Sequence, residues 1–400
     1  MSRLVLTNGR VNAGVDPQTV VIEDGRITQV IPGTPEPASG DTTIDLKGDL
    51  VLPGFVDGHA HIDKSLWGEP WVSRTSTEAS MEQFFQTTLY DWEHTTTPVG
   101  PRASAFLAEC VKGGSTTVRT FVDVAPEIGL RGLHDVLEIR DAWRDRVDLK
   151  VAASAQLGLL HRPGTAQLLE ESLRAGADTI ASLDPAAHDG DVEQHLDVMF
   201  GLAEKYGARV DFHLHEMGEL GFWVMSRIAA RTTALGMRGR VTLCDVFSLT
   251  DPPDGQLEPM ADVLAEAEIA VGMGLHGLYP IPDIGTLHAH GVRMFLGSDA
   301  PRSRWSPWGD GDILMRAMIL AYKCFYQRDE DLERSLTLAT DGGRASLGTE
   351  PCSVSVGDPA DLVVVPGENR AEIVVKPRPR TLVIKAGVIV ARNGELTDAA

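Results

Sequence analysis

Three short segments carry histidines and carboxylates at spacings that suit metal chemistry. His59 and His61 stand two residues apart, directly after the apolar run VLPGFV. His213 begins the pattern HxxE, which ends at Glu216, and Asp299 follows another apolar run in FLGSD. Neutral imidazole and carboxylate oxygen both suit ions such as Zn²⁺ and Fe²⁺. The sequence therefore predicts one divalent metal ion with four ligands: His59, His61, His213 and Asp299.

Strand geometry supports this interpretation of the first pair. Side chains alternate along a strand, so His59 and His61 can face one point, whereas the alternative is two surface histidines. His215 lies two residues after His213 and could replace it, bind substrate or support the metal. For Asp299, the alternative is a cap on the following loop.

Glu216 is the candidate for proton transfer. A glutamate that closely follows a metal histidine shuttles a proton from an activated water to a ring nitrogen in hydrolytic deaminases. Three imidazoles and one carboxylate leave the metal a position for a water, whose pKa falls towards neutrality. Asp299 could both bind the metal and accept the proton of that water.

The elements that position these residues alternate between strands and helices. About eight strand–helix units over residues 53–345 predict a (β/α)₈ barrel, in which active sites lie at the carboxyl ends of the strands. An open doubly wound sheet is the second choice. The expected strands are FVDGHAH, TTVRTFVDV, LKVAASAQ, TIASLDP, RVDFHLHE, RVTLCDV, EIAVGMG and RMFLGSD.

The two chain ends read as short strands instead. Residues 1–52 and 346–400 are expected to form one small β-sandwich domain beside the barrel domain, residues 53–345. Asp24 and Gly25 mark a hairpin turn between VVIE and RITQVI. In the tail, the expected strands are DLVVVPG, EIVVKP, TLVIKAG and VIVARNG.

Composition narrows the class of protein. The 400 residues carry a formal net charge of −21, which disfavours nucleic acid and anionic membrane and favours a neutral or cationic small molecule. The four cysteines form no CxxC, so a reduced, cytoplasmic setting is expected. Neither a signal peptide nor a membrane-spanning run is apparent. The dispersed histidines are expected at the surface or in loops: His94, His134, His161, His188 and His195. A second HxH, His288 and His290, is expected to be structural, because it lies at the end of a helix, where residues two apart face different ways.

Eight motifs in this order resemble those of the amidohydrolase superfamily, in its cytosine deaminase-like branch. They are PGFVDGHAHIDKS (53–65), GSTTVRTFVDV (114–124), VAASAQLG (151–158), LDPA (183–186), VDFHLHEMGELG (210–221), GRVT (239–242), GSDAPRSRWSPWGDGDIL (297–314) and VGDPADLVVV (356–365). The resemblance implies a metal-dependent hydrolase that forms a homo-oligomer. It carries metal binding onto the same four ligands and proton shuttling onto Glu216. It further implies substrate contacts from Gln156, Lys64 and the loop 302–310, which contains Trp305.

Three positions depart from the family pattern. Asp245 stands where the family has a histidine that activates water, Phe121 replaces a pocket histidine, and Ala300 replaces a polar residue after the metal aspartate. Asp245 could accept a proton from water, bind a cationic substrate group, or turn away to a loop arginine. The strand LKVAASAQ does not end in the lysine that binuclear relatives need, so a mononuclear centre is expected.

The sequence thus predicts a mononuclear hydrolase of C–N bonds in a cyclic amidine or amide-like small molecule, a nitrogen heterocycle that loses ammonia or a small alkylamine. Glu216 would protonate the ring nitrogen and the leaving amine, while Asp299 and Asp245 would handle the proton of the water. The alternatives are an amidase or ring-opening hydrolase, and a non-catalytic ligand-binding protein on the same fold.

Overall fold

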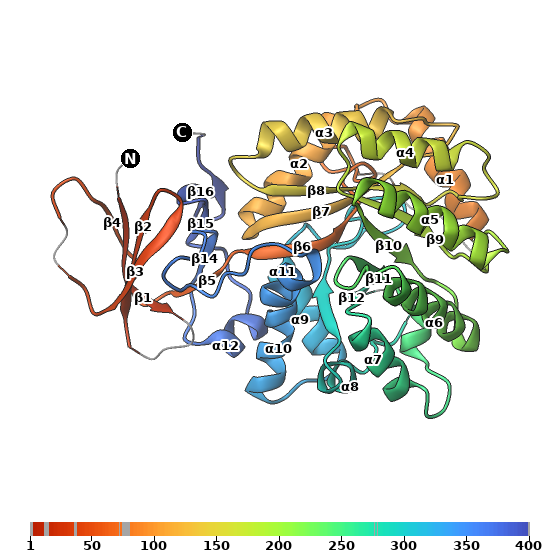
Figure 1. Cartoon of the computed structure of the whole chain (residues 1–400). Coiled ribbons are helices and arrows are strands. Elements are labelled where there is room, and N and C mark those ends of the chain that lie inside the picture. Colours follow the sequence, from red (N-terminus) through yellow and green to blue (C-terminus); the bar gives the residue numbers. More distant parts are fainter. Residues whose placement is uncertain are drawn as a thin grey trace.

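The computed structural model describes residues 3–11, 16–35, 38–71, 73, 81–275, 277 and 279–398. Two sheets organise these residues (Figure 1): an eight-stranded parallel sheet and a nine-stranded mixed sheet built from both chain ends. Helices surround the parallel sheet. The predicted (β/α)₈ barrel with a small additional β domain is confirmed.

The barrel strands follow one another in chain order, and each coincides with a segment predicted to be a strand. Nearly every residue in them is buried, as the strands of a sheet covered on both faces must be. Their bounds are β6 Phe55–Ala60, β7 Ser115–Asp123, β8 Asp148–Ala155, β9 Thr179–Leu183, β10 Arg209–His213, β11 Val241–Cys244, β12 Ala270–Met273 and β13 Arg293–Leu296.

The barrel closes where β6 meets the end of β13, and this seam carries three of the predicted ligands. The backbone N–H of His61 donates to the carbonyl of Asp299 at 2.8 Å, and the N–H of Asp299 donates to the carbonyl of His59 at 2.8 Å. A Cβ at Gly297 would lie 2.4 Å from the Cβ of His59, so only glycine permits this approach. Backbone pairing at the seam therefore brings His59 and His61 next to Asp299.

The helices lie mainly outside the barrel (Figure 1). None in the described part of the chain is both long and apolar enough to cross a membrane. Their bounds are α1 Met81–His94, α2 Val99–Lys112, α3 Arg131–Trp143, α4 Thr165–Ala175, α5 Val192–Tyr206, α6 Gly218–Ala234, η1 Phe247–Thr250, α7 Leu257–Glu266, α8 Ile284–Ala289, α9 Ile313–Lys323, α10 Asp329–Ala339, α11 Asp341–Leu347 and α12 Arg370–Val375.

The nine-stranded sheet joins the two ends of the chain through an antiparallel pair, β5 with β14. Both halves contribute to one apolar core, which includes Leu6, Ile22, Leu362 and Ile384. The predicted hairpin joins β2 and β3. The strand bounds are β1 Leu4–Val11, β2 Gln18–Glu23, β3 Arg26–Pro32, β4 Thr42–Asp45, β5 Leu50–Pro53, β14 Leu362–Val365, β15 Leu382–Lys385, β16 Val388–Arg392 and β17 Glu395–Leu396.

The prediction that the tail segment EIVVKP forms a strand is wrong, because its first four residues lie in helix α12. The Asn369 side chain accepts a hydrogen bond from the N–H of Glu372 at 2.8 Å and caps the helix. Ile373 and Val374 are buried in the main core, to which α9 and α10 also contribute. Capping and burial here outweigh the preference of β-branched residues for strands.

Candidate active site

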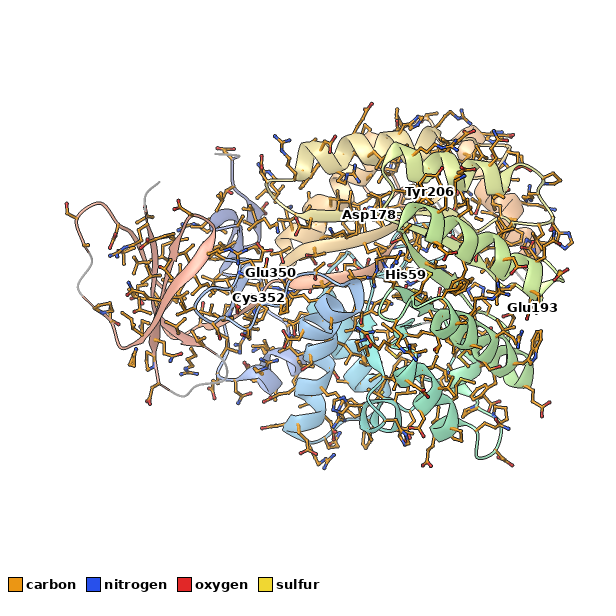
Figure 2. All side chains as sticks on the ribbon, viewed as in Figure 1. His59, Asp178, Glu193, Tyr206, Glu350 and Cys352 are labelled. Carbon is orange, nitrogen blue, oxygen red and sulfur yellow. The ribbon has the colours of Figure 1, made fainter. Side chains whose placement is uncertain are left out.

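Three of the predicted ligands meet inside the barrel. The Nε2 atom of His59 lies 3.1 Å from that of His61 and 3.1 Å from that of His213. All three side chains are buried. Figure 2 shows His59 inside the ring of barrel strands, whereas Glu193 lies on the outer helical layer. The strand ends thus bring together three imidazoles from β6, its continuation and β10.

The imidazoles are held in a state that suits metal binding. Burial lowers the pKa of His59 to about 4 and that of His61 well below its ordinary value, so both rings are neutral. The Nδ1 of His213 lies 3.0 Å from the Asp211 carboxylate, which can only accept. This nearby negative charge favours the tautomer of His213 that has its proton on Nδ1, which leaves the lone pair on Nε2.

The three histidine nitrogens lie within 4.8 Å of one another, and four of the six separations between the four predicted donors fit a single divalent ion. Two donors each about 2.1 Å from one ion lie about 3.0 to 4.2 Å apart, depending on the angle between them. The Asp299 carboxylate lies 4.0 Å from the Nε2 of His59 and 3.8 Å from that of His61. With the two histidine separations of 3.1 Å, all four distances fall in this range.

Beneath the histidines, two residues support the ring positions. Arg119 lies in the barrel interior, with Nη2 3.2 Å from Asp211. Burial raises the pKa of Asp211, but the charge of Arg119 together with His213 and Thr242 outweighs burial and lowers that pKa to about 2. Phe121 is fully buried, with its ring 4.9 Å from that of His59 and 4.6 Å from that of His213. The phenyl ring therefore packs against the ligands from the barrel interior.

Glu216 is held by backbone donors from a neighbouring loop. Its Oε1 accepts from the N–H groups of Ala186 and Ala187 at 2.7 and 3.0 Å, while Oε2 is buried without a hydrogen-bond partner. Burial, with the charge of Asp184, raises the pKa of Glu216 to about 7, although the backbone hydrogen bonds from Ala187 and Ala186 and the charge of His215 oppose the rise. A carboxyl group that titrates near neutrality is able to accept and return a proton.

His215 is not part of the imidazole cluster. Its Nδ1 lies 3.1 Å from the Asp184 carboxylate, and its Nε2 lies 3.8 Å from Asp245. Despite burial, hydrogen bonding to these carboxylates raises the pKa of His215 to about 10. The other oxygen of Asp245 lies 3.9 Å from the Nδ1 of His59. Asp245 thus stands between two imidazoles at the end of β11, in a left-handed conformation at φ 52°.

The predicted substrate contacts form a second cluster. Lys64 donates to the Oε1 of Gln156 at 2.7 Å and pairs with Asp123 at 2.9 Å. The ammonium lies 3.9 Å from the centre of the Trp305 ring, a cation–π contact. The Trp305 ring centre is 5.8 Å from that of His61. Gln156, Lys64 and Trp305 therefore meet next to the imidazoles.

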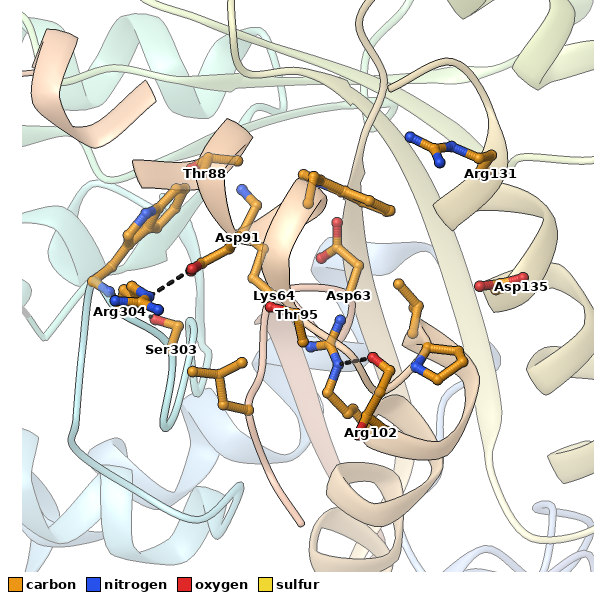
Figure 3. Close-up of a pocket in the computed structure, with 16 residues that line it drawn as sticks. Asp63, Lys64, Thr88, Asp91, Thr95, Arg102, Arg131, Asp135, Ser303 and Arg304 are labelled. Carbon is orange, nitrogen blue, oxygen red and sulfur yellow. Dashed lines mark hydrogen bonds and ion pairs between the residues drawn. The ribbon is translucent and has the colours of Figure 1, made fainter. Parts of the chain in front are cut away.

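Next to this cluster lies a cavity of about 180 Å³, which both Lys64 and Trp305 line (Figure 3). Asp63 is buried in its wall, with one carboxylate oxygen lacking a hydrogen-bond partner. An ion pair of 2.6 Å between Arg304 and Asp91 joins the loop 302–310 to helix α1. Helix α1 and this loop thus cover one side of the site.

Sequence reasoning missed the residues that hold the candidates in place. Asp123 ends β7 and Asp184 follows β9, which is the available signal for these two, whereas Asp211 lies inside β10, two residues before His213. Ala300, where the resemblance implies a polar residue, is fully buried. His195, predicted at the surface or in a loop, is fully buried in α5, because Asp189 and Ser182 satisfy both of its ring nitrogens.

Known proteins resemble this chain over nearly its whole length. It is 29% identical over 361 residues, 88% of both chains, to N-isopropylammelide isopropyl amidohydrolase of Pseudomonas sp. strain ADP. The crystal structure of N-isopropylammelide isopropylaminohydrolase from Burkholderia multivorans superposes with a TM-score of 0.94 at 37% identity, covering 99% of this chain and 100% of that one. A 5-methylcytosine deaminase structure from Klebsiella pneumoniae, 22% identical, shares the fold with a TM-score of 0.84 over 99% of both chains.

The family assignment rests on a model that covers most of the chain. The amidohydrolase family model matches residues 77–391, from just before α1 to β16. That range includes His213, Glu216, Asp245 and Asp299, and the HxH of β6 precedes it. The chain is therefore an enzyme that belongs to the amidohydrolase family.

Proposed function

We propose that this enzyme is a mononuclear, metal-dependent hydrolase that releases ammonia or a small alkylamine from a nitrogen heterocycle with cyclic amidine or amide groups. The observation that carries the proposal is the convergence of three buried Nε2 atoms: that of His59 lies 3.1 Å from those of His61 and His213. Glu216, three residues after His213, is buried as well. His59, His61, His213 and Asp299 would hold one Zn²⁺ or Fe²⁺ ion.

Glu216 transfers protons in this scheme. The bound ion would lower the pKa of a coordinated water towards neutrality. Glu216 would take one proton of the attacking water on Oε2, which is free of hydrogen bonds, and pass it to the ring nitrogen. The second proton of that water, which the hydroxyl of the adduct gives up as the C–N bond breaks, would pass to the leaving amine. The N–H groups of Ala186 and Ala187 keep Oε1 fixed throughout.

Asp299 and Asp245 would act on the second proton of the water, from the side opposite Glu216. Asp299 lies at the barrel seam within 4.0 Å of two ligand nitrogens. Asp245 occupies the family's histidine position and accepts hydrogen bonds, whereas a neutral imidazole both donates and accepts. The carboxylate makes the pocket more negative, which favours a basic or NH-rich heterocycle over an acidic one.

Lys64, Gln156 and Trp305 bind the substrate. Because the lysine ammonium can only donate, it holds the Oε1 of Gln156 and leaves the amide N–H₂ of Gln156 to face an acceptor on the ring. The Trp305 ring supplies an aromatic surface over Lys64.

A panel of heterocycles tests the proposal together with metal analysis. N-isopropylammelide, 5-methylcytosine, cytosine and pterin are offered to the purified enzyme, and released ammonia and isopropylamine are measured separately from loss of the ring chromophore. We expect amine release with one equivalent of zinc or iron per chain. Ring loss without amine identifies a ring-opening hydrolase, and binding without turnover identifies the non-catalytic alternative.

A further inference from the structure

A buried polar group lies on the helical side of β9. The Nδ1 of His195 in α5 lies 2.7 Å from the Asp189 carboxylate, and its Nε2 lies 2.7 Å from the hydroxyl of Ser182. A carboxylate only accepts, so Nδ1 carries a proton and donates it to Asp189. His195 is 0% exposed, and both of its nitrogens are satisfied.

Serine, histidine and aspartate in one line are also the arrangement of nucleophilic hydrolases. Ser182 is 1% exposed and is covered by α5, so no substrate reaches its hydroxyl. Ser182, His195 and Asp189 therefore do not act as a nucleophilic triad, and their role depends on the backbone groups that Asp189 binds.

Asp189 joins two loops at the carboxyl end of the barrel. Its second oxygen accepts from the N–H groups of Leu160 and His161 at 3.0 and 3.3 Å. These residues belong to the loop that follows β8 and Gln156, whereas Asp189 belongs to the loop that follows β9. One buried carboxylate, oriented by His195, thus fixes one loop against the other.

The loop after β9 is the one that holds Glu216. Ala186 and Ala187, which donate to its Oε1, precede Asp189 by three and two residues. A displacement of Asp189 therefore moves both donors, because two peptide units leave little slack between them. Hydrogen bonds of this kind set the direction in which the free oxygen of a carboxylate points.

We propose that His195 is a positioning residue: by orienting Asp189 it fixes the β9–α5 loop, whose backbone N–H groups aim Glu216 at the substrate. The inference rests on the proposed function, since it assigns His195 an effect only through the proton shuttle. His195 itself touches neither substrate nor metal ligand.

Three variants separate positioning from stability. His195→Leu removes both hydrogen bonds, His195→Asn keeps a donor near the position of Nδ1, and Phe200→Leu removes packing from α5 without touching Asp189. With N-isopropylammelide, or the panel heterocycle hydrolysed fastest, His195→Leu should lower kcat roughly 10- to 100-fold at unchanged KM. His195→Asn should restore most of the loss, and Phe200→Leu should lower the melting temperature with kcat retained.

The decisive measurement repeats His195→Leu in the Glu216→Gln background. The effect of His195→Leu on kcat should vanish there, because the shuttle it positions is already absent. An equal loss in both backgrounds overturns the inference and leaves the shuttle intact. Wild-type turnover of Glu216→Gln alone overturns the proposed function itself.

Hydrogen–deuterium exchange provides a readout that needs no substrate. In the holoenzyme, His195→Leu should speed amide exchange in peptides covering residues 158–163 and 184–190, whereas His195→Asn and Phe200→Leu should not do so selectively. Unchanged exchange in both peptides of His195→Leu would overturn the positioning role.

Discussion

His213 shows how one side chain is prepared for a metal ion. The Asp211 carboxylate lies 3.0 Å from the Nδ1 of His213, and Arg119 helps to keep Asp211 ionised, so the proton of His213 is favoured on Nδ1 and the lone pair on Nε2. Partners of this kind fix both the tautomer and the orientation of a ligating histidine. Asp211 and Arg119 thus set which nitrogen of His213 is available to a metal ion.

At this scale, His61→Ala tests the metal assignment. Loss of one of three imidazole ligands should remove most of the bound metal and all activity, because the remaining donors hold the ion too weakly. Metal content by plasma mass spectrometry and amine release are the measurements. The control is His288→Ala, an exposed histidine from the other HxH, which should retain both. Full metal occupancy in His61→Ala would refute the assignment.

The pKa of Glu216 sets an expected pH dependence. Burial raises that pKa to about 7, with Asp184 and His215 as the facing charges, and only the carboxylate form can accept the proton of water. The value of kcat/KM should therefore rise with pH through the pKa of Glu216 in the free enzyme. Glu216→Gln should keep the metal, lose this rise of kcat/KM with pH and lower turnover by roughly 10²- to 10⁴-fold. The control is Glu219→Gln, at an exposed position. An unchanged rise of kcat/KM with pH in Glu216→Gln would contradict the role of Glu216 as proton shuttle.

Asp245 is the residue at which this chain departs most from its family pattern. It is buried between His59 and His215, so a direct role predicts that Asp245→Asn and Asp245→Ala both lose turnover or substrate binding while retaining the metal. Steady-state kinetics and metal content on the same preparations measure this. Wild-type kinetics in both variants would leave the proton transfers to Glu216 and Asp299 alone.

At the scale of elements, helix α1 and the loop 302–310 act together as a cover. Phe84 in α1 contacts the Trp305 ring, and Asp91 in the same helix pairs with Arg304 in the loop. The cover thus places Trp305 next to Lys64 and His61. These contacts link residues more than 200 positions apart.

Breaking that ion pair should loosen the cover. Asp91→Asn is expected to raise KM roughly two- to fivefold with a smaller effect on kcat, because a half-exposed ion pair contributes about 0.5 to 1 kcal/mol. Titration of the substrate dependence of the rate measures the change. Glu93→Gln, an exposed position in the same helix, is the control. A fall in kcat at constant KM would show that the pair affects chemistry and not binding.

At the scale of the whole molecule, a buried ion pair fastens the nine-stranded sheet to the barrel. Lys385 in β15 lies 2.7 Å from Asp361 and 2.8 Å from Asp148 at the start of β8. Asp361 is 4% exposed, so removing the lysine leaves a buried charge without its partner. Lys385→Ala should therefore cost about 3 to 5 kcal/mol of unfolding free energy, measured by denaturant titration.

The control has the same geometry at the surface. Lys205 lies 2.7 Å from Glu170, but its side chain is 59% exposed. Lys205→Ala should leave the unfolding free energy from the same denaturant titration almost unchanged, because solvent screens the ion pair. Equal effects of the two substitutions would show that the sheet does not depend on Lys385. The domain limits at 52/53 and 345/346 and the homo-oligomer remain predictions at this scale.

The sequence by itself determined the barrel and the metal cluster, because both depend on local regularities. Alternation along β6 places His59 and His61 on one face, and parallel strands of a barrel end at the same rim, which also brings in His213 and Asp299. The pattern of apolar runs sufficed to predict all eight barrel strands. Asp24 and Gly25 likewise have positive φ in the predicted hairpin.

Only the tertiary structure decided which side chains support these groups. The pairing of His215 with Asp184, the donors to Glu216 and the burial of His195 join segments that no periodicity links. In the same way, α12 replaced a predicted strand because contacts with distant helices stabilise it. Backbone spacing along a strand sets the direction of the side chains at its end. Hydrogen bonds between loops depend instead on how separate strand–helix units pack against one another, and this packing is fixed only when the barrel closes.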